Sequence, residues 1–185
     1  MDILCLKDSM RIIGGKLKGK TILPPPGYKA RPTTDFAREG LFNILGGEYE
    51  FEGLRVLDLF GGTGAVAFEF ASRGASVVYS VEMARENASF IKREAERLGL
   101  GNVVMVRANV FDFIPLCREK FDIIFADPPY ALEGVETLPD RIFEKELLFP
   151  ERTLILEHSG EHDFSAHPRF VKMRRYGAVH FSFFE

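Results

Sequence analysis

The sequence predicts an α/β fold, a doubly wound mixed sheet of seven strands that closes on an antiparallel hairpin. From about residue 54 onward, short apolar runs of strand length alternate with segments of helical periodicity. A glycine-rich turn joins the first of these strands to its helix. The last two apolar runs, residues 170–174 and 179–184, have no helix between them, which favours antiparallel pairing.

Strands and helices are expected to alternate strictly before that closing hairpin. The strands are predicted at residues 54–60, 76–81, 103–107, 121–126 and 153–158, and the helices at residues 65–71, 84–98, 110–119 and 141–149. A chain of 185 residues is long enough for one domain that buries about 70% of its unfolded surface. The hydrophobic fraction of 46% is ordinary for a soluble globular protein.

One further helix is predicted before the first of these strands, running to about residue 45. Thr33 or Thr34 can cap its beginning, and Gly46 with Gly47 is expected to end it. Its apolar face should hold Phe36, Leu41, Ile44 and Leu45. Gly40 inside the helix costs roughly 1 kcal/mol relative to alanine, a local conflict with the prediction.

The amino-terminal end is predicted to have three parts. Residues 1–10 form a tail or an upstream start, without the basic segment and cleavage site of a signal peptide. Residues 11–30 form a basic hairpin arm, two short strands around Gly14, Gly15 and Gly19, followed by a proline-rich linker. Residues 31–185 form the main domain.

Charge is distributed unevenly along the chain. Residues 1–10 contribute −1 and residues 11–34 contribute +6, so the remainder carries −8 of the total of −3. A basic end on an acidic body is typical of a protein that binds a polyanion at one place. The alternative is a solvated, lysine-rich hairpin. Alternation along the hairpin would direct Lys16, Lys18 and Lys20 to one face. The candidate polyanion contacts are Arg11, Lys16, Lys18, Lys20 and Arg31.

Residues 127–130 (Asp-Pro-Pro-Tyr, the 127–130 motif) directly follow a predicted buried strand. Two prolines cannot extend a central strand, so the chain leaves the sheet there. The carboxyl edge of such a sheet is where ligands bind. The motif combines an acceptor-only carboxylate, rigidly held carbonyls and an aromatic face. That set suits an exocyclic amine on a flat ring, although Asp-Pro-Pro also occurs in ordinary turns.

Residues 61–64 (Gly-Gly-Thr-Gly, the glycine turn) lie between a predicted strand and a helix, as in nucleotide-type sites. Glu82 ends the next strand, about twenty residues on, the spacing at which a carboxylate binds ribose hydroxyls. The looser dinucleotide pattern G-x-G-x-x-A is also satisfied, so NAD is an alternative. An NAD protein usually adds a second βαβ half and a catalytic domain, for which this chain has no room.

S-adenosylmethionine fits the same strand ends better than NAD does. It has no phosphate, and its amino acid part carries a charged amine. Asp58, at the strand end before the glycine turn, is well placed to hold that amine directly or through water. Asp58, the glycine turn, Glu82 and the 127–130 motif occur in this order on successive strands. Together they favour a methyltransferase.

Several segments carry a resemblance to one family. They are residues 11–15 (Arg-Ile-Ile-Gly-Gly), 19–20, 31–35 (Arg-Pro-Thr-Thr-Asp), 38–39, 41–45, 58–64, 81–82, 108–110, 126–130 and 175–177. In this order they resemble the RsmD-type 16S ribosomal RNA guanine-N2 methyltransferases, over residues 11–184. The glycine turn departs from the Ala-Gly-Ser-Gly that this family more often has. Residues 31–35 narrow the resemblance to this family, since the other motifs are shared with many amino-methylating enzymes.

The resemblance implies a Rossmann-like, seven-stranded class I S-adenosylmethionine-dependent methyltransferase with a small amino-terminal β-hairpin arm. Its cofactor-binding residues would be Arg38, Asp58, Phe60, Gly61, Gly62, Gly64, Glu82, Asn109 and Val110. Asn109 and Val110 would face the adenine, and Arg38 the methionine carboxylate. Asp127, Pro128, Pro129 and Tyr130 would hold the guanine N2 amine for direct methyl transfer. The substrate would be 16S ribosomal RNA, naked or in a partly assembled small subunit.

Other functions stay open at this stage. An amino-methyltransferase for adenine N6 or a protein glutamine amide would share the 127–130 motif, and a catalytically silent RNA-binding module is a further alternative. Residues 158–162 match the zinc-protease pattern H-x-x-E-H, but they follow a strand and contain Ser-Gly, so we expect no metal site. The chain has no apolar run of membrane-spanning length. The two cysteines make no disulfide framework, so we expect a cytoplasmic protein. We also expect a monomer.

Overall fold

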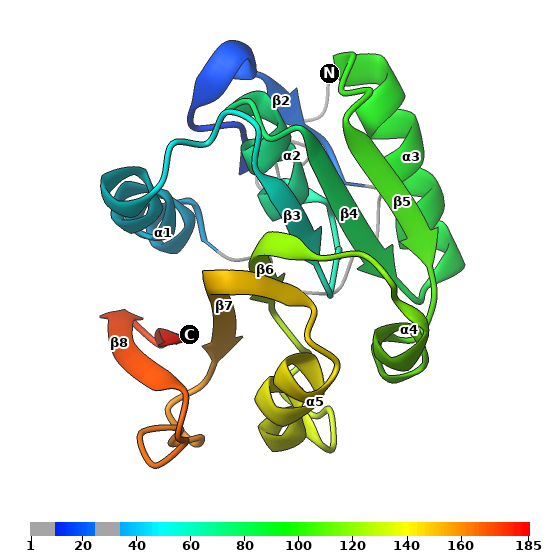
Figure 1. The fold of residues 1–185 in the computed structure, drawn as a ribbon. Helices are drawn as coiled ribbons and strands as arrows, with labels where there is room; N and C mark the ends of the chain where they lie inside the picture. Colours follow the sequence, from blue (N-terminus) through cyan, green and yellow to red (C-terminus); the bar gives the residue numbers. More distant parts are fainter. Residues whose placement is uncertain (1–9, 25–33) are drawn as a thin grey trace.

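The computed structural model describes residues 10–24 and 34–185. Over these residues the chain forms a seven-stranded sheet in the order β5-β4-β3-β6-β7-β9-β8 and a separate two-stranded sheet, β1-β2. Helices cover both faces of the large sheet (Figure 1). The predicted mixed sheet of seven strands with its antiparallel closing hairpin is thereby confirmed.

The strands are β1 (Met10–Arg11), β2 (Thr21–Ile22), β3 (Arg55–Asp58), β4 (Val77–Glu82), β5 (Val103–Arg107), β6 (Phe121–Ala126), β7 (Leu148–His158), β8 (Phe170–Tyr176) and β9 (Val179–Phe184). The helices are α1 (Asp35–Glu48), α2 (Ala65–Ser72), α3 (Arg85–Leu98), α4 (Val110–Leu116) and α5 (Leu138–Glu144), with short 3-10 turns η2 (Gly15–Leu17) and η3 (Val135–Thr137). Among the described residues, no helix combines the length and apolar character needed to cross a lipid bilayer.

Three of the predicted helices have wrong boundaries. Helix α1 runs through both glycines to Glu48, because neither Gly46 nor Gly47 adopts the left-handed conformation that would end it. Helix α4 ends at residue 116, because residues 118–120 are exposed charged side chains with no apolar face to bury. Helix α5 begins three residues earlier than predicted, with Pro139 in its first turn, and Leu148 already pairs with β6.

Helix α1 packs as predicted on one side but not at its start. The Thr34 side chain accepts a hydrogen bond from the Ala37 amide at 3.2 Å and caps the helix. Phe36, predicted to be on the apolar face, is instead 68% exposed. Gly40 has a packing reason, because a Cβ atom there would lie 2.2 Å from the ring of Tyr176 on β8. The helix glycine therefore lets α1 pack closely against the closing hairpin.

The sheet changes direction between β3 and β6. From β3 the chain continues to β4 and β5 on one side, and β6 and β7 are added on the other side of β3. All these strands are parallel, so their carboxyl ends meet at one edge. One face packs residues such as Val56 and Ile123 against α1, α2 and α3, and the opposite face packs Leu57 and Ile124 against α4 and α5. Such a switch point opens a crevice for a ligand.

The amino-terminal hairpin is part of the core rather than a projecting arm. Met10, Ile12 and Ile22 are buried in the same cluster as the helices α1 and α2. Between the two strands the chain forms the turn η2, which contacts α2. The predicted strand pair is confirmed, but regular alternation does not extend through residues 15–17. Two segments lie outside the described residues: the predicted tail at 1–9, and residues 25–33. The second segment includes part of the predicted linker and Arg31.

Candidate active site

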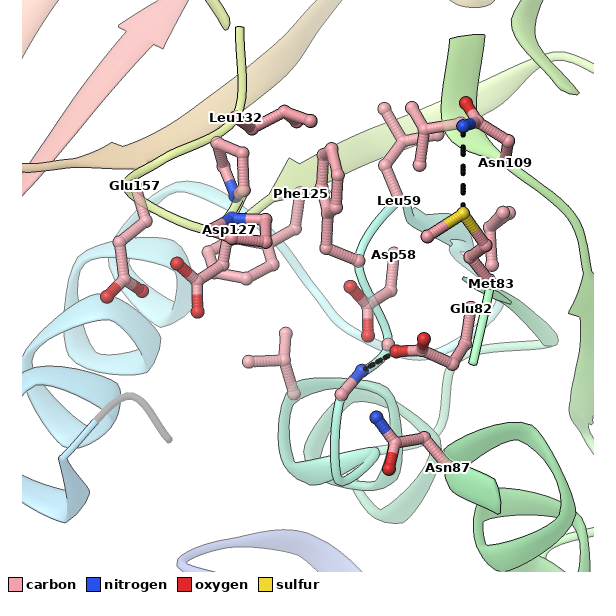
Figure 2. Close-up of a pocket in the computed structure, with 18 of the residues that line it drawn as sticks. Asp58, Leu59, Glu82, Met83, Asn87, Asn109, Phe125, Asp127, Leu132 and Glu157 are labelled. Carbon is pink, nitrogen blue, oxygen red and sulfur yellow. Dashed lines mark hydrogen bonds between the residues drawn. The ribbon is translucent and has the colours of Figure 1, made fainter. Parts of the chain in front are cut away.

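A cavity of about 460 Å³ lies at the carboxyl ends of β3, β4, β6 and β7. Figure 2 shows side chains from these four strands facing it. Its lining includes Asp58, Phe60, the first three residues of the glycine turn, Glu82, Asn109, Val110 and all four residues of the 127–130 motif. The chain segments that the sequence analysis selected for the cofactor and for the substrate amine therefore meet in one cavity.

The glycine turn is held by backbone hydrogen bonds to its neighbours. The Gly61 amide donates to the Val81 carbonyl at 2.8 Å, which ties the turn to β4. Gly62 and Gly64 have positive φ angles of 53° and 78°. A Cβ atom on Gly61 would lie 2.4 Å from the Ser80 hydroxyl oxygen, so only glycine lets the turn lie this close to β4. Gly64 does not line the cavity and is instead the N-cap residue of helix α2.

Glu82 fixes the position of the turn through its carboxylate. One oxygen accepts a hydrogen bond from the Gly62 amide at 2.9 Å, and the other accepts one from the Ala84 amide at 2.7 Å. Figure 2 shows the first of these bonds at the cavity wall. Because each carboxylate oxygen has two acceptor sites, both oxygens keep capacity for a further donor. Glu82 can therefore hold the turn and accept hydroxyl groups from a ligand.

Asp58 lines the cavity from a buried position. The residue is 1% exposed, and its Oδ1 atom has no hydrogen-bond partner. Burial raises the pKa of the carboxyl to about 8, a backbone hydrogen bond from Phe60 opposes this, and the nearby Asp127 and Glu82 carboxylates add to it. A buried carboxyl with an orphaned oxygen is costly unless a donor or a cation completes it.

The 127–130 motif lies where the chain leaves β6. Pro128 is buried, whereas Pro129 and Tyr130 are exposed, Tyr130 by 64%. The motif and Leu132 form the wall of the cavity opposite Glu82 and Asn87 (Figure 2). An exposed aromatic ring beside a carboxylate at a cavity rim can stack on a flat ligand.

Sheet register explains why carboxylates gather here. Asp58 is paired with Ser80 on β4 and with Phe125 on β6, and Phe125 is paired with Ile155 on β7. Side chains two residues further along each strand point to the same face. Glu82, Asp127 and Glu157 are those residues. Four carboxylates, one per strand, therefore lie at one edge of one sheet face (Figure 2).

Glu157 is a lining residue that the sequence analysis missed. It is 4% exposed and lies on β7, the parallel neighbour of β6. Its position at the end of a predicted strand was the available signal. That signal was not used because the sequence alone does not say which strands are neighbours. Met83, Phe111 and Leu132 also line the cavity and were not selected.

The predicted adenine side of the cavity is formed by the start of α4. The Asn109 side-chain oxygen accepts a hydrogen bond from the Phe111 amide at 2.9 Å and so caps the helix. Its amide nitrogen lies 3.7 Å from the Met83 sulfur across the cavity mouth (Figure 2). Val110 is buried below them. This end of the cavity offers an apolar slot with an amide at its rim.

Arg38 does not line this cavity. It is a buried residue of α1 whose guanidinium donates hydrogen bonds to the Arg11 carbonyl and to Asp35 at 2.8 Å. Its Nε and Nη1 atoms have no hydrogen-bond partner. Arg38 thus joins the amino-terminal hairpin to α1, a position that gives no support to the predicted contact with a methionine carboxylate.

The candidate polyanion contacts lie on the hairpin surface. Arg11, Lys16, Lys18 and Lys20 are all exposed. The turn with Lys16 contacts the end of α2, where the Leu17 amide donates to the Ser72 hydroxyl. The eight residues of α2 separate this point from the glycine turn by about 12 Å. Lys16 therefore lies at the far end of α2 from the glycine turn, whereas Met10, at the start of the hairpin, contacts Thr63 of that turn.

The histidines of the H-x-x-E-H match have structural partners. The two ring nitrogens of His158 lie 2.7 Å from the Ser159 carbonyl oxygen and 2.8 Å from the Ser182 hydroxyl. Burial lowers the pKa of His158. In the described part of the chain, no group of three or more His, Cys, Asp or Glu side chains is arranged to hold a metal ion.

Comparisons with known proteins agree with this geometry. The sequence model of the family described as "Conserved hypothetical protein 95" matches residues 10–185. The ribosomal RNA small subunit methyltransferase D of Escherichia coli K12 is 30% identical over 90% of this chain and 83% of its own length. That of Buchnera aphidicola (strain Bp) is 35% identical over 66% of this chain, a match that spans 62% of the Buchnera protein.

A solved structure extends the likeness to three dimensions. The structure described as a putative methyltransferase yhhF from Escherichia coli has a TM-score of 0.82 and 30% identity, covering 95% of this chain and 97% of the other. The chain belongs to the conserved hypothetical protein 95 family, the RsmD family of methyltransferases.

Proposed function

We propose that this protein transfers a methyl group from S-adenosylmethionine to the exocyclic N2 amine of a guanine in small-subunit ribosomal RNA, in the cytoplasm. The observation that carries the proposal is the shared cavity. It joins a buried carboxyl with an orphaned oxygen, a glycine turn and an Asp-Pro-Pro-Tyr strand end. Relatives named ribosomal RNA small subunit methyltransferase D support the choice of substrate.

The residues of the β3–β4 side fit the cofactor. The unpartnered Oδ1 atom of Asp58 suits the ammonium of the methionine part. Glu82 keeps acceptor capacity for ribose hydroxyls. Gly61 leaves the backbone room that a Cβ atom would fill. Val110 and Phe111 supply an apolar wall for the adenine, as ligand pockets usually do.

The β6–β7 side fits the base that is modified. When bound, S-adenosylmethionine supplies an electrophilic methyl group on a sulfonium, whose C–S bonding pair stays on sulfur as the new N–C bond forms. Asp127 and the Pro128 carbonyl accept hydrogen bonds from the two N2–H groups and turn the nitrogen lone pair toward the methyl group. Asp127 also stabilises the positive charge that develops on nitrogen and is placed to receive the proton that leaves it. Holding the two reactants in line supplies roughly 7–11 kcal/mol of the barrier.

Tyr130 stacks on the guanine, a contact worth about 1–3 kcal/mol per base. A guanine in an RNA loop is already unstacked or is flipped out at low cost. Arg11, Lys16, Lys18 and Lys20 contact phosphates away from the cavity, on the surface of the amino-terminal hairpin. The RNA would then extend along the length of α2 from the cavity to the turn η2.

Nucleoside analysis of ribosomal RNA tests the proposal. The protein is incubated with labelled S-adenosylmethionine and with ribosomal RNA or small subunits from a strain that lacks the gene, and the labelled nucleoside and its position are determined. N2-methylguanosine at one position of the small-subunit RNA is expected. Label in N6-methyladenosine or in a protein glutamine would instead establish one of the alternative amino-methyltransferases, and binding of the cofactor without transfer would leave only an RNA-binding role.

A further inference from the structure

Glu157 lies beside Asp127 in the candidate active site, and no part of the proposed mechanism uses it. Register places the two residues next to each other, because Ala126 and Leu156 are paired and each carboxylate residue comes next in its strand. Figure 2 shows both carboxylates facing the same side of the cavity. Glu157 is 4% exposed and lines the cavity. It therefore faces the same part of the cavity as Asp127.

Placing two carboxylates next to each other lowers the stability of the folded protein. Removing a carboxylate from water costs free energy, and placing a second one beside it adds repulsion. The glutamate comes from a strand whose preceding residues, Ile155 and Leu156, are fully buried apolar side chains. A ligand edge that consists of hydrogen-bond donors can contact both groups at once.

The Watson–Crick edge of guanine is such an edge. Its N1–H donor is adjacent to the N2 amine, so the base presents three donor hydrogens side by side. Adenine presents an acceptor at N1, which would face a carboxylate with a lone pair. Carboxylates only accept hydrogen bonds. Asp127, Glu157 and the Pro128 carbonyl together form a set of acceptors that matches guanine and opposes adenine.

We propose that Glu157 accepts a hydrogen bond from guanine N1–H and thereby selects guanine as the base to be methylated. The inference rests on the proposed function, which assigns the N2 amine to Asp127 and Pro128. With N1–H held by Glu157, the ring cannot rotate about the N2 contact, so the amine is presented to the methyl group in one orientation. Glu157 thus acts both in selection and in positioning.

The test replaces the N1–H group of the substrate. RNA is assembled by splinted ligation with either guanine or 2-aminopurine at the mapped position, and reconstituted into subunits if these are the better substrate. 2-Aminopurine keeps the N2 amine but has a bare acceptor at N1. The wild-type protein should methylate the guanine RNA about 10- to 100-fold faster in kcat/KM, the range for losing a hydrogen bond to a charged group.

The variant Glu157→Gln makes the test specific to this side chain. An amide can donate to the bare N1 of 2-aminopurine, so the variant should lose activity on guanine and reduce the guanine preference at least tenfold. The loss of the guanine oxygen O6 in 2-aminopurine affects both proteins equally and cancels in this comparison. Glu161→Gln, the same change at an exposed position outside the cavity, should keep the wild-type preference and activity.

The outcomes separate this inference from the proposed function. If the wild-type protein methylates 2-aminopurine as well as guanine, or if Glu157→Gln keeps the wild-type preference, Glu157 does not read N1–H although N2 methylation stands. If the wild-type protein places no methyl group on guanine N2 of ribosomal RNA, the proposed function itself fails and the inference fails with it. Even if the glutamine variant does not fold, a wild-type protein that methylates 2-aminopurine as fast as guanine overturns the inference.

Discussion

The two ends of the cavity each hold two carboxylates, but they hold them differently. On the β3–β4 side, the Glu82 oxygens accept hydrogen bonds from backbone amides of the glycine turn and of the start of α3. Asp58 is buried on the same side, and its Oδ1 atom has no hydrogen-bond partner. On the β6–β7 side, Asp127 and Glu157 lie on adjacent strand ends, beside a chain stiffened by two prolines. The first arrangement combines backbone amides with a buried carboxyl, and the second combines two neighbouring carboxylates with the exposed ring of Tyr130.

The difference suggests a division of labour. A backbone-lined turn with a buried carboxyl suits tight binding of one constant ligand, because its groups cannot move to accommodate another. Exposed groups such as Tyr130 beside paired carboxylates suit a base that enters from a large RNA and must leave again. We therefore expect changes on the β3–β4 side to weaken cofactor binding, and changes on the β6–β7 side to slow transfer.

The largest effect is expected for Asp127→Ala. Methyl transfer should fall by on the order of a hundredfold or more, as for loss of a positioned electrostatic group, while affinity for S-adenosylmethionine stays nearly unchanged. Calorimetric titration and single-turnover transfer measure the two quantities. A variant that retains its rate would show that another group holds the amine.

On the other side of the cavity, Asp58→Ala should weaken S-adenosylmethionine binding by about 1.5–3 kcal/mol, the range for hydrogen bonds to charged groups. The affinity of the folded variant is measured by calorimetry, with circular dichroism as the check on folding. An unchanged affinity would show that Asp58 does not bind the cofactor. It would also contradict the proposal that the β3–β4 side binds the cofactor and the β6–β7 side holds the base.

The pH dependence of cofactor binding should come from the carboxyl of Asp58, on the β3–β4 side. Because burial raises the pKa of Asp58 to about 8, the free protein must lose a proton there before the carboxylate can pair with an ammonium. Affinity should therefore rise with pH below about 8, by up to about tenfold per unit, and level off above it. Asp58→Asn should bind weakly with no such slope. A flat wild-type profile between pH 6 and 8 would contradict the assignment.

The same group should affect stability without any ligand. The raised pKa means that the folded protein keeps a proton which the unfolded chain, near the ordinary value of 3.8, has lost. The contribution of Asp58 to the free energy of unfolding therefore falls as pH rises from about 4 to about 8. Urea unfolding of the wild type and of Asp58→Asn across this window should show a smaller decline for the variant.

The smallest effect is expected outside the cavity, at the exposed lysines of the hairpin. Each lost phosphate contact lowers the slope of log affinity against log salt by about 0.7 to 0.9. Replacing Lys16, Lys18 and Lys20 by alanine should make the slope for substrate RNA shallower by about two, with cofactor affinity unchanged. Equal slopes for the variant and the wild type would mean that these lysines are a solvated surface and that another face binds RNA.

The sequence by itself determined features that depend on neighbours in the chain. The bounds of β5, β6 and β9 are those predicted, because each is an apolar run of strand length with a polar residue at its end or directly after it. The Thr34 cap follows from local chemistry in the same way. Asp58, Glu82 and Asp127 were selected because each ends a strand, and the carboxyl ends of parallel strands meet at one edge.

Only the tertiary structure decided which distant side chains meet. Glu157 lines the cavity because β7 pairs with β6 in a register that places it beside Asp127. Because the hairpin packs into the core, Arg38 contacts the hairpin, and Lys16 lies at the far end of α2 from the glycine turn. Gly40 leaves room for the ring of Tyr176, which a Cβ atom at this position would contact too closely. Strand order, register and packing between segments are set by burying the whole core at once, and no local pattern carries that information.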